Sequence, residues 1–378
     1  MASYGIDASD GVPITCCVAP GPTQDALRLC VAPGKEISAV SPSRENMRIL
    51  VTGGAGFIGS HLAEELLQRG HEVWALDDLS TGRLENLTTF ERHPRFRFLE
   101  GSVMDTALVH GLVAQCDRVF HLAAAVGVKY VLENPLRSLL TNIRGTEVVL
   151  EAASKHRRKV ILTSSSEVYG KGVSVPFSED DDRLIGPTHK LRWSYACGKA
   201  VDECLAHAYH QQYQLPVVIV RCFNTCGPRQ SSAYGMVIPN MVQRALQGEP
   251  ILVFGDGQQT RCFSAVTDVV GAMLLLADSR QAEGHVFNAG TDEEITVHEL
   301  ARRIKRLCHS DSPIELVPYE EVYGQSFEDM RRRVPDLKKI RRFVGYRPQV
   351  TLDRLLETTI RDHCERMGVP CPIEVSAA

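Results

Sequence analysis

The sequence lacks any long apolar run. Its hydrophobic segments all fall short of the roughly 20 consecutive residues that a membrane-spanning helix requires. The first residues also lack the basic stretch followed by an apolar stretch that marks a secretory signal. We therefore expect neither a membrane protein nor a secreted one, and we predict a cytoplasmic location.

Cysteine pairs with a recognisable spacing are missing as well. The chain has 12 cysteines, but none forms a CxxC motif, and no cysteine and histidine spacing matches a zinc site. Scattered thiols in a chain of this size fit a reducing compartment better than a framework of disulfides. We accordingly predict no metal site.

An excess of positive charge is also absent. The net charge is −4 and no basic stripe stands out, which argues against a nucleic-acid partner. The densest basic cluster, Arg331-Arg332-Arg333, is too short for a nucleic-acid-binding arm and suits the solvated end of a helix. With 44% hydrophobic and 23% charged residues, the composition is that of an ordinary globular protein.

The chain divides by composition and pattern into four stretches. Residues 1–46 contain Pro, Gly and Ser without sustained periodicity, and we expect a mobile extension there, with a docking arm as the alternative. Apolar runs that alternate with helical spacing begin at residue 47, and we assign 47–225 to a first domain. Shorter elements follow over 226–365, which we interpret as mainly a substrate-binding part, and 366–378 forms a tail.

Three glycines mark the start of the first domain. Residues 48–51 form an apolar run typical of a buried strand, and Gly53, Gly56 and Gly59 follow it where helical spacing begins. Such glycines permit a tight turn, let the backbone approach a pyrophosphate and let the helix pack on the strand. The helix N-terminus then presents free N–H groups to the phosphates. The pattern predicts a dinucleotide site.

An acidic residue supports this prediction and selects the cofactor. A second apolar run ends at Asp77, about 20 residues after the glycines, as the dinucleotide fingerprint requires. Its carboxylate would accept hydrogen bonds from ribose hydroxyls and repel a 2′-phosphate, so NAD is favoured over NADP. The other residues that we expect to contact the cofactor lie in the glycine loop or at strand ends: Phe57, Ile58, Ser102, Val103, Leu122, Ala123, Ala124 and Thr163.

The same alternation of apolar runs and helical segments continues along the chain. Strands that alternate with helices imply a parallel sheet covered by helices on both faces. We predict an α/β fold with a doubly wound parallel sheet and a smaller C-terminal substrate-binding part. The expected strands are 48–51, 72–76, 96–99, 118–122, 159–162 and 216–221.

A tyrosine and a lysine follow the fifth of these strands. Tyr195 and Lys199 are four residues apart on a predicted helix, so they share one face of it. A free tyrosine has a pKa near 10. We expect the Lys199 ammonium and the positive nicotinamide to lower that pKa. Tyr195 would then take a proton from a sugar hydroxyl as a general base.

These motifs together resemble the extended short-chain dehydrogenase/reductase family of NAD-dependent nucleotide-sugar epimerases, dehydratases and decarboxylases. The resemblance covers about residues 47–363. It implies a Rossmann fold, NAD as cofactor and a first step that oxidises the sugar at C4. The motifs that carry it are Gly53-x-x-Gly56-x-x-Gly59, Asp77, Ser165, Tyr195-x-x-x-Lys199 and Asn224-x-x-Gly227-Pro228-Arg229.

The resemblance also implies roles for several side chains. Ser165 looks like the hydroxyl that holds the substrate's O4 beside Tyr195. Asn224 and Arg261 look like groups near the substrate's pyrophosphate, and Arg333 like a further phosphate ligand. Two helices, about 135–156 and 194–213, carry long apolar faces, and the equivalent pair in the family forms a dimer interface. We therefore expect a homodimer.

The residues at 166 and 167 distinguish among the family's reactions. Dehydratases of the family usually carry an Asp-Glu pair there, and this chain has Ser166, so dehydration is the least favoured outcome. Simple 4-epimerases usually carry a small or hydroxyl residue where this chain has Glu167. Two segments are similar to the corresponding segments of UDP-glucuronate decarboxylases: Ser-Glu-Val-Tyr-Gly at 166–170 and Gln259-Thr260-Arg261-Cys262-Phe263. The resemblance therefore favours decarboxylation of UDP-glucuronate to UDP-xylose or UDP-4-keto-xylose.

The residues near the substrate carboxylate suit this chemistry. Oxidation of glucuronate at C4 makes a β-keto acid, which loses carbon dioxide readily. We expect Glu167 to act through its like charge on the substrate carboxylate and to position a proton donor, with Ser166 beside it. Arg261 would assist by binding acidic oxygens.

One loop favours the alternative, a 4-epimerase of a UDP-sugar or UDP-uronate. Residues 126–135 look more like the loop of UDP-uronate 4-epimerases than that of a decarboxylase, and Lys129 would grip a carboxylate there or face solvent. The presence of both Tyr195 and Lys199 argues against a protein that keeps NAD only as a structural ligand.

Overall fold

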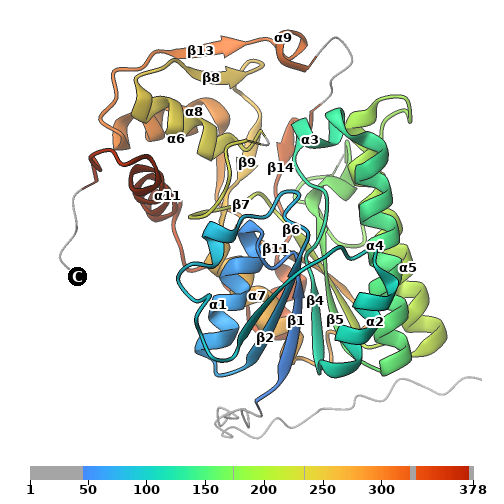
Figure 1. Cartoon of the computed structure of the whole chain (residues 1–378). Coiled ribbons are helices and arrows are strands. Elements are labelled where there is room, and N and C mark those ends of the chain that lie inside the picture. The colour runs from blue at the N-terminus through green and yellow to red at the C-terminus, as the bar shows by residue number, and fades with distance from the viewer. Residues whose placement is uncertain (1–45, 173, 234, 324–328, 374–378) are drawn as a thin grey trace, which may run out of the picture. The chain divides into compact units, whose positions relative to one another are not determined.

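The computed structural model describes residues 46–172, 174–233, 235–323 and 329–373 (Figure 1). The predicted extension 1–46 lies outside the described residues except for its last position, as does the end of the tail from 374 onward. None of the helices within the described ranges is long and apolar enough to cross a membrane.

Seven parallel strands form a central sheet in the order β3-β2-β1-β4-β5-β6-β11. Their bounds are β1 Arg48–Thr52, β2 Glu72–Asp77, β3 Phe96–Glu100, β4 Arg118–His121, β5 Lys159–Ser165, β6 Val217–Cys222 and β11 Val286–Ala289. The order runs outward from β1 in both directions, so the topological switch point lies between β1 and β4. The six predicted strands and the doubly wound parallel sheet are confirmed.

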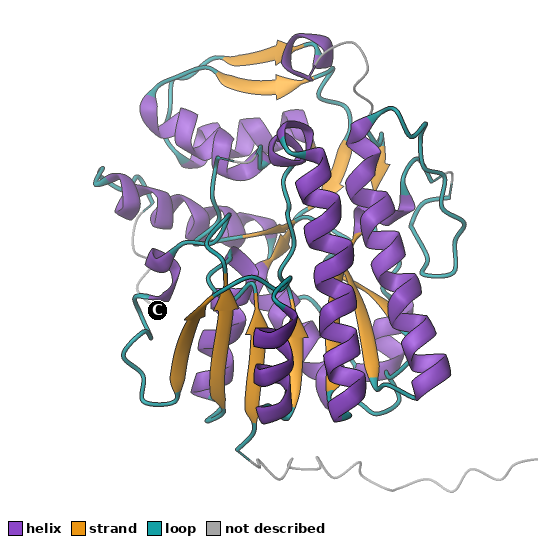
Figure 2. Ribbon diagram, turned by 45° about the vertical axis from the view of Figure 1, so that its right-hand side comes forward, coloured by secondary structure: helices purple, strands orange, loops and turns teal. Residues whose placement is uncertain are grey.

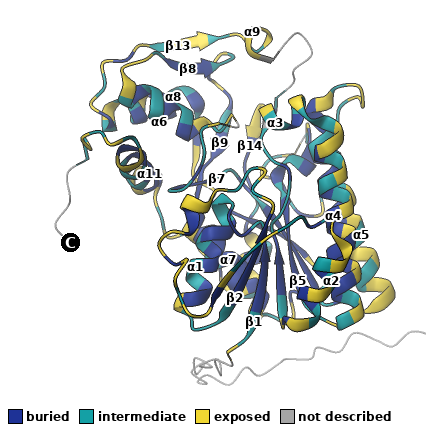
Figure 3. Ribbon diagram, viewed as in Figure 1, coloured by how far each residue is buried: buried dark blue, intermediate teal, exposed yellow. Residues whose placement is uncertain are grey.

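Helices cover both faces of this sheet (Figure 2). One face carries α1 (Phe57–Gln68), α7 (Val266–Asp278) and α10 (Lys338–Val344), and the other carries α2 (Thr106–Gln115), α4 (Pro135–His156) and α5 (Ser194–Tyr213). Successive strand residues point to opposite faces. Thus Ile49 packs in the core beneath α1 and α7, whereas Leu50 packs in the core beneath α2 and α4. The strands are accordingly buried along most of their length (Figure 3).

The smaller part has its own apolar core, formed by three helices around short strands. The helices are α6 (Val237–Gln247), α8 (Val297–Leu307) and α11 (Leu352–Met367). The strands pair as β7 (Thr225–Cys226) with β10 (Ser264–Ala265), β8 (Ile251–Phe254) with β13 (Ile314–Val317), and β9 (Thr260–Cys262) with β12 (Glu294–Thr296) and β14 (Arg332–Arg333). Two short helices, α3 (Val128–Glu133) and α9 (Tyr319–Tyr323), complete the described elements together with 3₁₀ turns at Leu84–Leu87, Ser166–Tyr169 and Leu191–Trp193.

The chain leaves the central sheet after β6 and later returns to it. Along the chain, α6, β8 and β9 come first. α7 then packs on the central sheet, and β11 joins the edge of that sheet beside β6. The proposed division at residue 225 stays a prediction, since both parts of the chain contribute to the sheet.

Candidate active site

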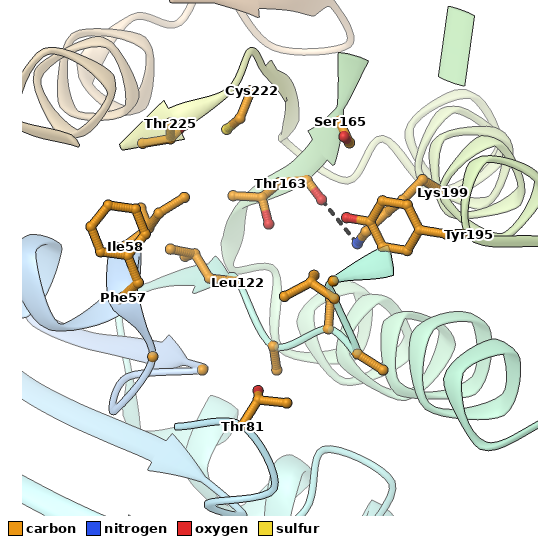
Figure 4. Close-up of a pocket in the computed structure, with 18 of the residues that line it drawn as sticks. Phe57, Ile58, Thr81, Leu122, Thr163, Ser165, Tyr195, Lys199, Cys222 and Thr225 are labelled. Atoms are coloured by element: carbon orange, nitrogen blue, oxygen red, sulfur yellow. Dashed lines mark hydrogen bonds between the residues drawn. The ribbon is translucent and has the colours of Figure 1, made fainter. Parts of the chain in front are cut away.

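A cavity of about 370 Å³ opens at the carboxyl ends of the central strands (Figure 4). Residues from the glycine loop, from the ends of β2, β4, β5 and β6, and from the start of α5 line it. Of the residues singled out in the sequence, the cavity is lined by Gly53, Gly56, Phe57, Ile58, Gly59, Asp77, Val103, Leu122, Ala123, Ala124, Thr163, Ser165, Ser166, Glu167, Tyr195, Lys199, Asn224 and Arg333.

The glycine loop leaves space where a side chain would intrude. Gly53 has a φ of +71°, and a Cβ there would lie 2.8 Å from the backbone nitrogen of Ala123. A Cβ on Gly59 would collide with the carbonyl oxygen of Gly53, because α1 begins directly against the loop. Gly56 is the N-cap of α1, so the first free N–H groups of this helix adjoin the cavity. The loop therefore fits a dinucleotide pyrophosphate.

Asp77 is fixed at the end of β2 by the same loop. Its Oδ2 accepts a hydrogen bond from the Ala55 N–H at 3.0 Å, and its Oδ1 accepts one from the Leu79 N–H at 2.9 Å. Burial raises the pKa of this carboxyl, and the two N–H groups act against that rise. The carboxylate lines the cavity, where ribose hydroxyls would supply further donors. The residues present thus fit NAD.

Tyr195 and Lys199 project from the first turns of α5 into this cavity (Figure 4). The Lys199 Nζ donates to the carbonyl oxygen of Thr163 at 3.1 Å and to Asp202 Oδ2 at 3.2 Å, so the ammonium is fully anchored beneath β5. Ser165 at the end of β5 lines the same cavity. The shared helix face that the spacing predicts therefore brings both groups to the end of β5.

The protein surroundings act on Tyr195 in the direction opposite to the one that we expected. Burial of its hydroxyl, together with the nearby Glu167 carboxylate, raises the pKa of Tyr195 above its ordinary value, and the opposing influence of Ser165 is too weak to prevent the rise. The reason is that Lys199 is itself balanced by the buried Asp202. A lowered pKa must therefore depend on the positive nicotinamide.

Glu167 lies between two arginines. Its Oε1 is 2.8 Å from Arg333 Nη1 and its Oε2 is 2.7 Å from Arg192 Nη2. Burial raises the pKa of this carboxyl, but the two guanidiniums outweigh burial and lower the pKa to about 2. Glu167 is therefore ionised and its charge is compensated. This corrects the expectation that it would repel a substrate carboxylate through like charge.

Three residues from the sequence interpretation do not line the cavity. Ser102 lies beyond β3, where its Oγ accepts a hydrogen bond from the Met104 N–H at 3.3 Å. Lys129 is exposed on α3. Arg261 is buried on β9, with its guanidinium 2.7 Å from Asp329 Oδ2. Their assignments to cofactor or substrate remain predictions.

The arginine cluster near the C-terminal part also differs from expectation. Arg332 and Arg333 form strand β14 beside β9 and do not end a helix. Arg331 and Arg332 are exposed and pair with Asp256 and Glu294, whereas Arg333 is 8% exposed and reaches the cavity. Its Nη1 also contacts the Asn224 Oδ1 at 3.2 Å. Strand pairing thus carries one of three arginines into the site.

Sequence reasoning missed Arg192 altogether. This residue lies in the 3₁₀ turn Leu191–Trp193, directly before α5, and lines the cavity while only 6% exposed. An arginine at a helix entrance is ordinarily solvated. Its position in the sequence could have indicated this role, because a residue three positions before Tyr195 lies just before the first turn of the helix that carries Tyr195.

No group of three or more His, Cys, Asp or Glu side chains that would suit a metal ion occurs among the residues that the structure describes.

Several known proteins are similar to this chain over most of its length. The family model described as GDP-mannose 4,6 dehydratase matches residues 50–359. A UDP-N-acetyl-alpha-D-glucosaminuronate decarboxylase from Bacillus cytotoxicus is 46% identical over 318 residues, which cover 83% of this chain and 97% of that protein. UDP-glucuronic acid decarboxylase 6 from Arabidopsis thaliana is 37% identical over 328 residues, which cover 86% of this chain and 92% of that protein.

A solved structure extends the similarity to the whole described fold. The UDP-glucuronic acid 4-epimerase from Bacillus cereus, in complex with UDP-glucuronic acid and NAD, matches with a TM-score of 0.77 and 28% identity. The match covers 85% of this chain and 100% of that chain. The chain belongs to the GDP-mannose 4,6-dehydratase family, within the extended short-chain dehydrogenases/reductases that its motifs resemble.

Proposed function

We propose that the protein is an NAD-dependent decarboxylase that converts UDP-glucuronate, through a 4-keto intermediate, to UDP-xylose or UDP-4-keto-xylose. The observation that carries the proposal is the ionised Glu167, held between Arg192 and Arg333 in the same cavity as Tyr195 and Ser165. The relatives named as uronate decarboxylases support it.

The first step removes two hydrogens from C4 of the sugar. NAD, when bound, accepts the hydride from C4 and later returns it. Tyr195 takes the proton of the C4 hydroxyl, and Ser165, which lines the same cavity, holds the same oxygen. Lys199, four residues further along the same helix, is itself held by the Thr163 carbonyl oxygen and Asp202.

The second step breaks the bond between C5 and the carboxylate carbon. The electron pair of that bond moves into a 4,5-enolate as carbon dioxide leaves, and C5 then takes up one proton. Glu167 is ionised and cannot itself supply this proton. We assign it the role of holding a water molecule at C5, with Arg333 beside it to stabilise the developing enolate charge.

The mass of the product provides the direct test. Incubation of the full chain with NAD and UDP-glucuronate is expected to give a nucleotide sugar lighter by one carbon dioxide if UDP-xylose forms, or by one carbon dioxide and two hydrogens if UDP-4-keto-xylose is released, as read by mass spectrometry. A product of unchanged mass would contradict the proposal. Parallel incubations with UDP-galacturonate and UDP-glucose identify the sugar that the site prefers.

Related substrates and reactions are separated by the same incubations when the configuration at C4 is read as well as the mass. The relative from Bacillus cytotoxicus is named for a uronate with an N-acetyl group, so UDP-N-acetylglucosaminuronate belongs among the substrates tested. The solved UDP-glucuronic acid 4-epimerase has the same fold, and a product of equal mass with inverted C4 would establish 4-epimerisation as the activity. Dehydration, the least favoured reaction, would be recognised by the loss of water.

We also propose a homodimer formed through α4 and α5, which lie side by side (Figures 1 and 2). Leu136 and Leu140 of α4 are 69% and 49% exposed, and Val201 of α5 is 40% exposed. Leu140→Asp is expected to give a monomer by light scattering coupled to gel filtration, because a charge in an apolar interface is costly. Leu316→Asp, on the exposed strand β13, is the matched control and should leave the mass unchanged. A wild-type monomer would contradict the proposal.

The location of the protein is part of the same proposal. All nine cysteines within the described residues are free thiols, which fits the cytoplasm.

A further inference from the structure

The carboxylate of Glu203 lies buried beside the end of β5 that lines the cavity. Glu203 is on α5, four residues after Lys199 and eight after Tyr195, so the three side chains share one helix face. It is 3% exposed and does not line the cavity itself. Its Oε1 accepts a hydrogen bond from the Ser164 Oγ at 2.6 Å. The two proposed reaction steps leave this buried carboxylate without a role.

α5 holds two consecutive residues of β5 through side chains that are one helical turn apart. The Lys199 Nζ donates to the Thr163 carbonyl oxygen, a contact that Figure 4 shows as a dashed line. Glu203 holds the next residue, Ser164, by its side chain. Ser164 faces α5 because strand residues alternate, and Leu162, two residues earlier, packs in the core on that side of the sheet. The end of β5 is therefore attached to α5 at two points.

Arg221 of β6 fixes the Glu203 carboxylate in turn. Its Nε lies 2.9 Å from Oε1 and its Nη2 lies 2.8 Å from Oε2, which makes a bidentate ion pair. Arg183 is a more distant second partner, with its Nη1 3.7 Å from Oε2. Arg221 pairs with Ser164 across β6 and β5, and its guanidinium carbon lies 4.7 Å from the centre of the Tyr169 ring, in the turn that follows β5. One carboxylate thus links α5, β5 and β6.

The contacts of α5 with the sheet change in kind along the helix. Beyond Glu203, buried apolar side chains such as Ala206 join the core. A buried ion pair adds little net stability over well-packed apolar residues, but its hydrogen bonds fix a geometry. The charged contacts of Lys199 and Glu203 occur in the turns nearest Tyr195. Their place on the helix therefore suits the alignment of groups at the cavity better than simple attachment of the helix.

We infer that Glu203, acting through Ser164, is a positioning residue for the oxidation of the sugar at C4. Ser164 lies between Thr163 and Ser165, so its hydrogen bond fixes both neighbours at the end of the strand. The carboxylate thereby sets the position of Ser165 relative to Tyr195. Transfer of the proton and hydride depends steeply on such positions. The inference rests on the proposed function, since it concerns the first step of that reaction.

Ser164→Ala tests the inference, because it removes this hydrogen bond and leaves the pair of Glu203 with Arg221 in place. At saturating UDP-glucuronate, single-turnover formation of reduced nicotinamide is expected to slow by about ten- to hundredfold. The UDP-glucuronate concentration that gives half of the maximal rate is expected to change by less than about threefold. A merely structural role would lower the unfolding temperature and leave the maximal rate unchanged, and that result would overturn the inference.

Thr359→Val is the matched control variant. Thr359 is buried in α11, where its Oγ1 donates to the Leu355 carbonyl oxygen at 2.8 Å, and it does not line the cavity. The substitution likewise removes one buried hydroxyl and its hydrogen bond. It is expected to lower the unfolding temperature without slowing oxidation. If it slows oxidation as much as Ser164→Ala does, the loss of any buried hydrogen bond would explain the result and the inference fails.

A double-mutant cycle shows whether Ser164 acts through Glu203, because Ser164 also lines the cavity and its hydroxyl could contact the substrate directly. Glu203→Gln is measured alone and combined with Ser164→Ala. If Ser164 acts through the carboxylate, the double variant should oxidise the sugar no more slowly than the slower single variant. Losses that multiply would show independent action and overturn the inference. Glu203→Asp, which keeps the charge beside Arg221, replaces Glu203→Gln in the cycle if the amide variant does not fold.

Failure of the proposed function gives a different result from failure of this inference. In the first case, wild-type enzyme releases no carbon dioxide from UDP-glucuronate, yet it still forms reduced nicotinamide faster than Ser164→Ala does. In the second case, carbon dioxide is released and the two enzymes oxidise the sugar at the same rate.

Discussion

Replacing Tyr195 with phenylalanine is expected to slow the oxidation of the sugar C4 by about 10²- to 10⁴-fold, the usual contribution of a general base. The substitution removes only the Tyr195 hydroxyl, from the cavity that Ser165 also lines. Single-turnover formation of reduced nicotinamide, followed by absorbance after mixing with UDP-glucuronate, measures this step separately from carbon dioxide release.

A second tyrosine on the same helix provides the control. Tyr213 is 60% exposed at the far end of α5, and Tyr213→Phe should leave the rate unchanged. The pH profile gives an independent check. Burial and the Glu167 carboxylate raise the pKa of Tyr195, so wild-type oxidation should accelerate with rising pH as this group loses its proton. A Tyr195→Phe enzyme with the wild-type rate and profile would exclude Tyr195 as the base.

Glu167→Gln is expected to reduce carbon dioxide release by about 10²- to 10³-fold while C4 oxidation falls by less than about tenfold. Glutamine preserves the shape of the side chain but removes the charge that Arg192 and Arg333 share. The freed guanidiniums should then hold the substrate carboxylate more tightly and delay its departure. Product mass together with the accumulation of reduced nicotinamide distinguishes the two steps.

Stability measurements accompany this variant because the ion pairs also hold the fold. The pKa of Glu167 is about 2 in the folded protein, below the ordinary value of 4.5. The ionised carboxylate therefore stabilises the fold above about pH 4.5, and this contribution is lost as the pH falls through 2. Glu167→Gln should lower the unfolding temperature at neutral pH. Asp329→Asn, which neutralises a carboxylate outside the cavity, is the control variant. Undiminished decarboxylation by Glu167→Gln would exclude a role for Glu167.

The parts of the site that depend on local spacing were accessible from the sequence. The glycine loop and Asp77 belong to one strand–helix–strand unit, and their positions follow from the geometry of that unit. Tyr195 and Lys199 share a helix face because they are four residues apart. Six of the seven central strands were likewise visible as short apolar runs.

The parts that depend on distant contacts were not accessible. Arg333 reaches the cavity because β14 pairs with β9, which brings its Cα opposite that of Arg261. Neighbours of the same type, Arg331 and Arg332, remain exposed, so residue type alone did not identify the buried one. The compensation of Glu167 by Arg192 joins segments on either side of a long loop, and no periodic pattern records such a pairing.

The return of β11 to the central sheet has a consequence for how the chain is made. During synthesis, β6 emerges from the ribosome well before β11, with α6, β8 and α7 produced in between. Until β11 arrives, the nascent sheet has an unpaired edge of apolar residues, the kind of surface that associates with other chains. The Asn288 side chain on β11 also accepts a hydrogen bond from the hydroxyl of Tyr169, in the turn that follows β5. Truncations that stop between these strands should therefore aggregate rather than yield a separate nucleotide-binding fragment.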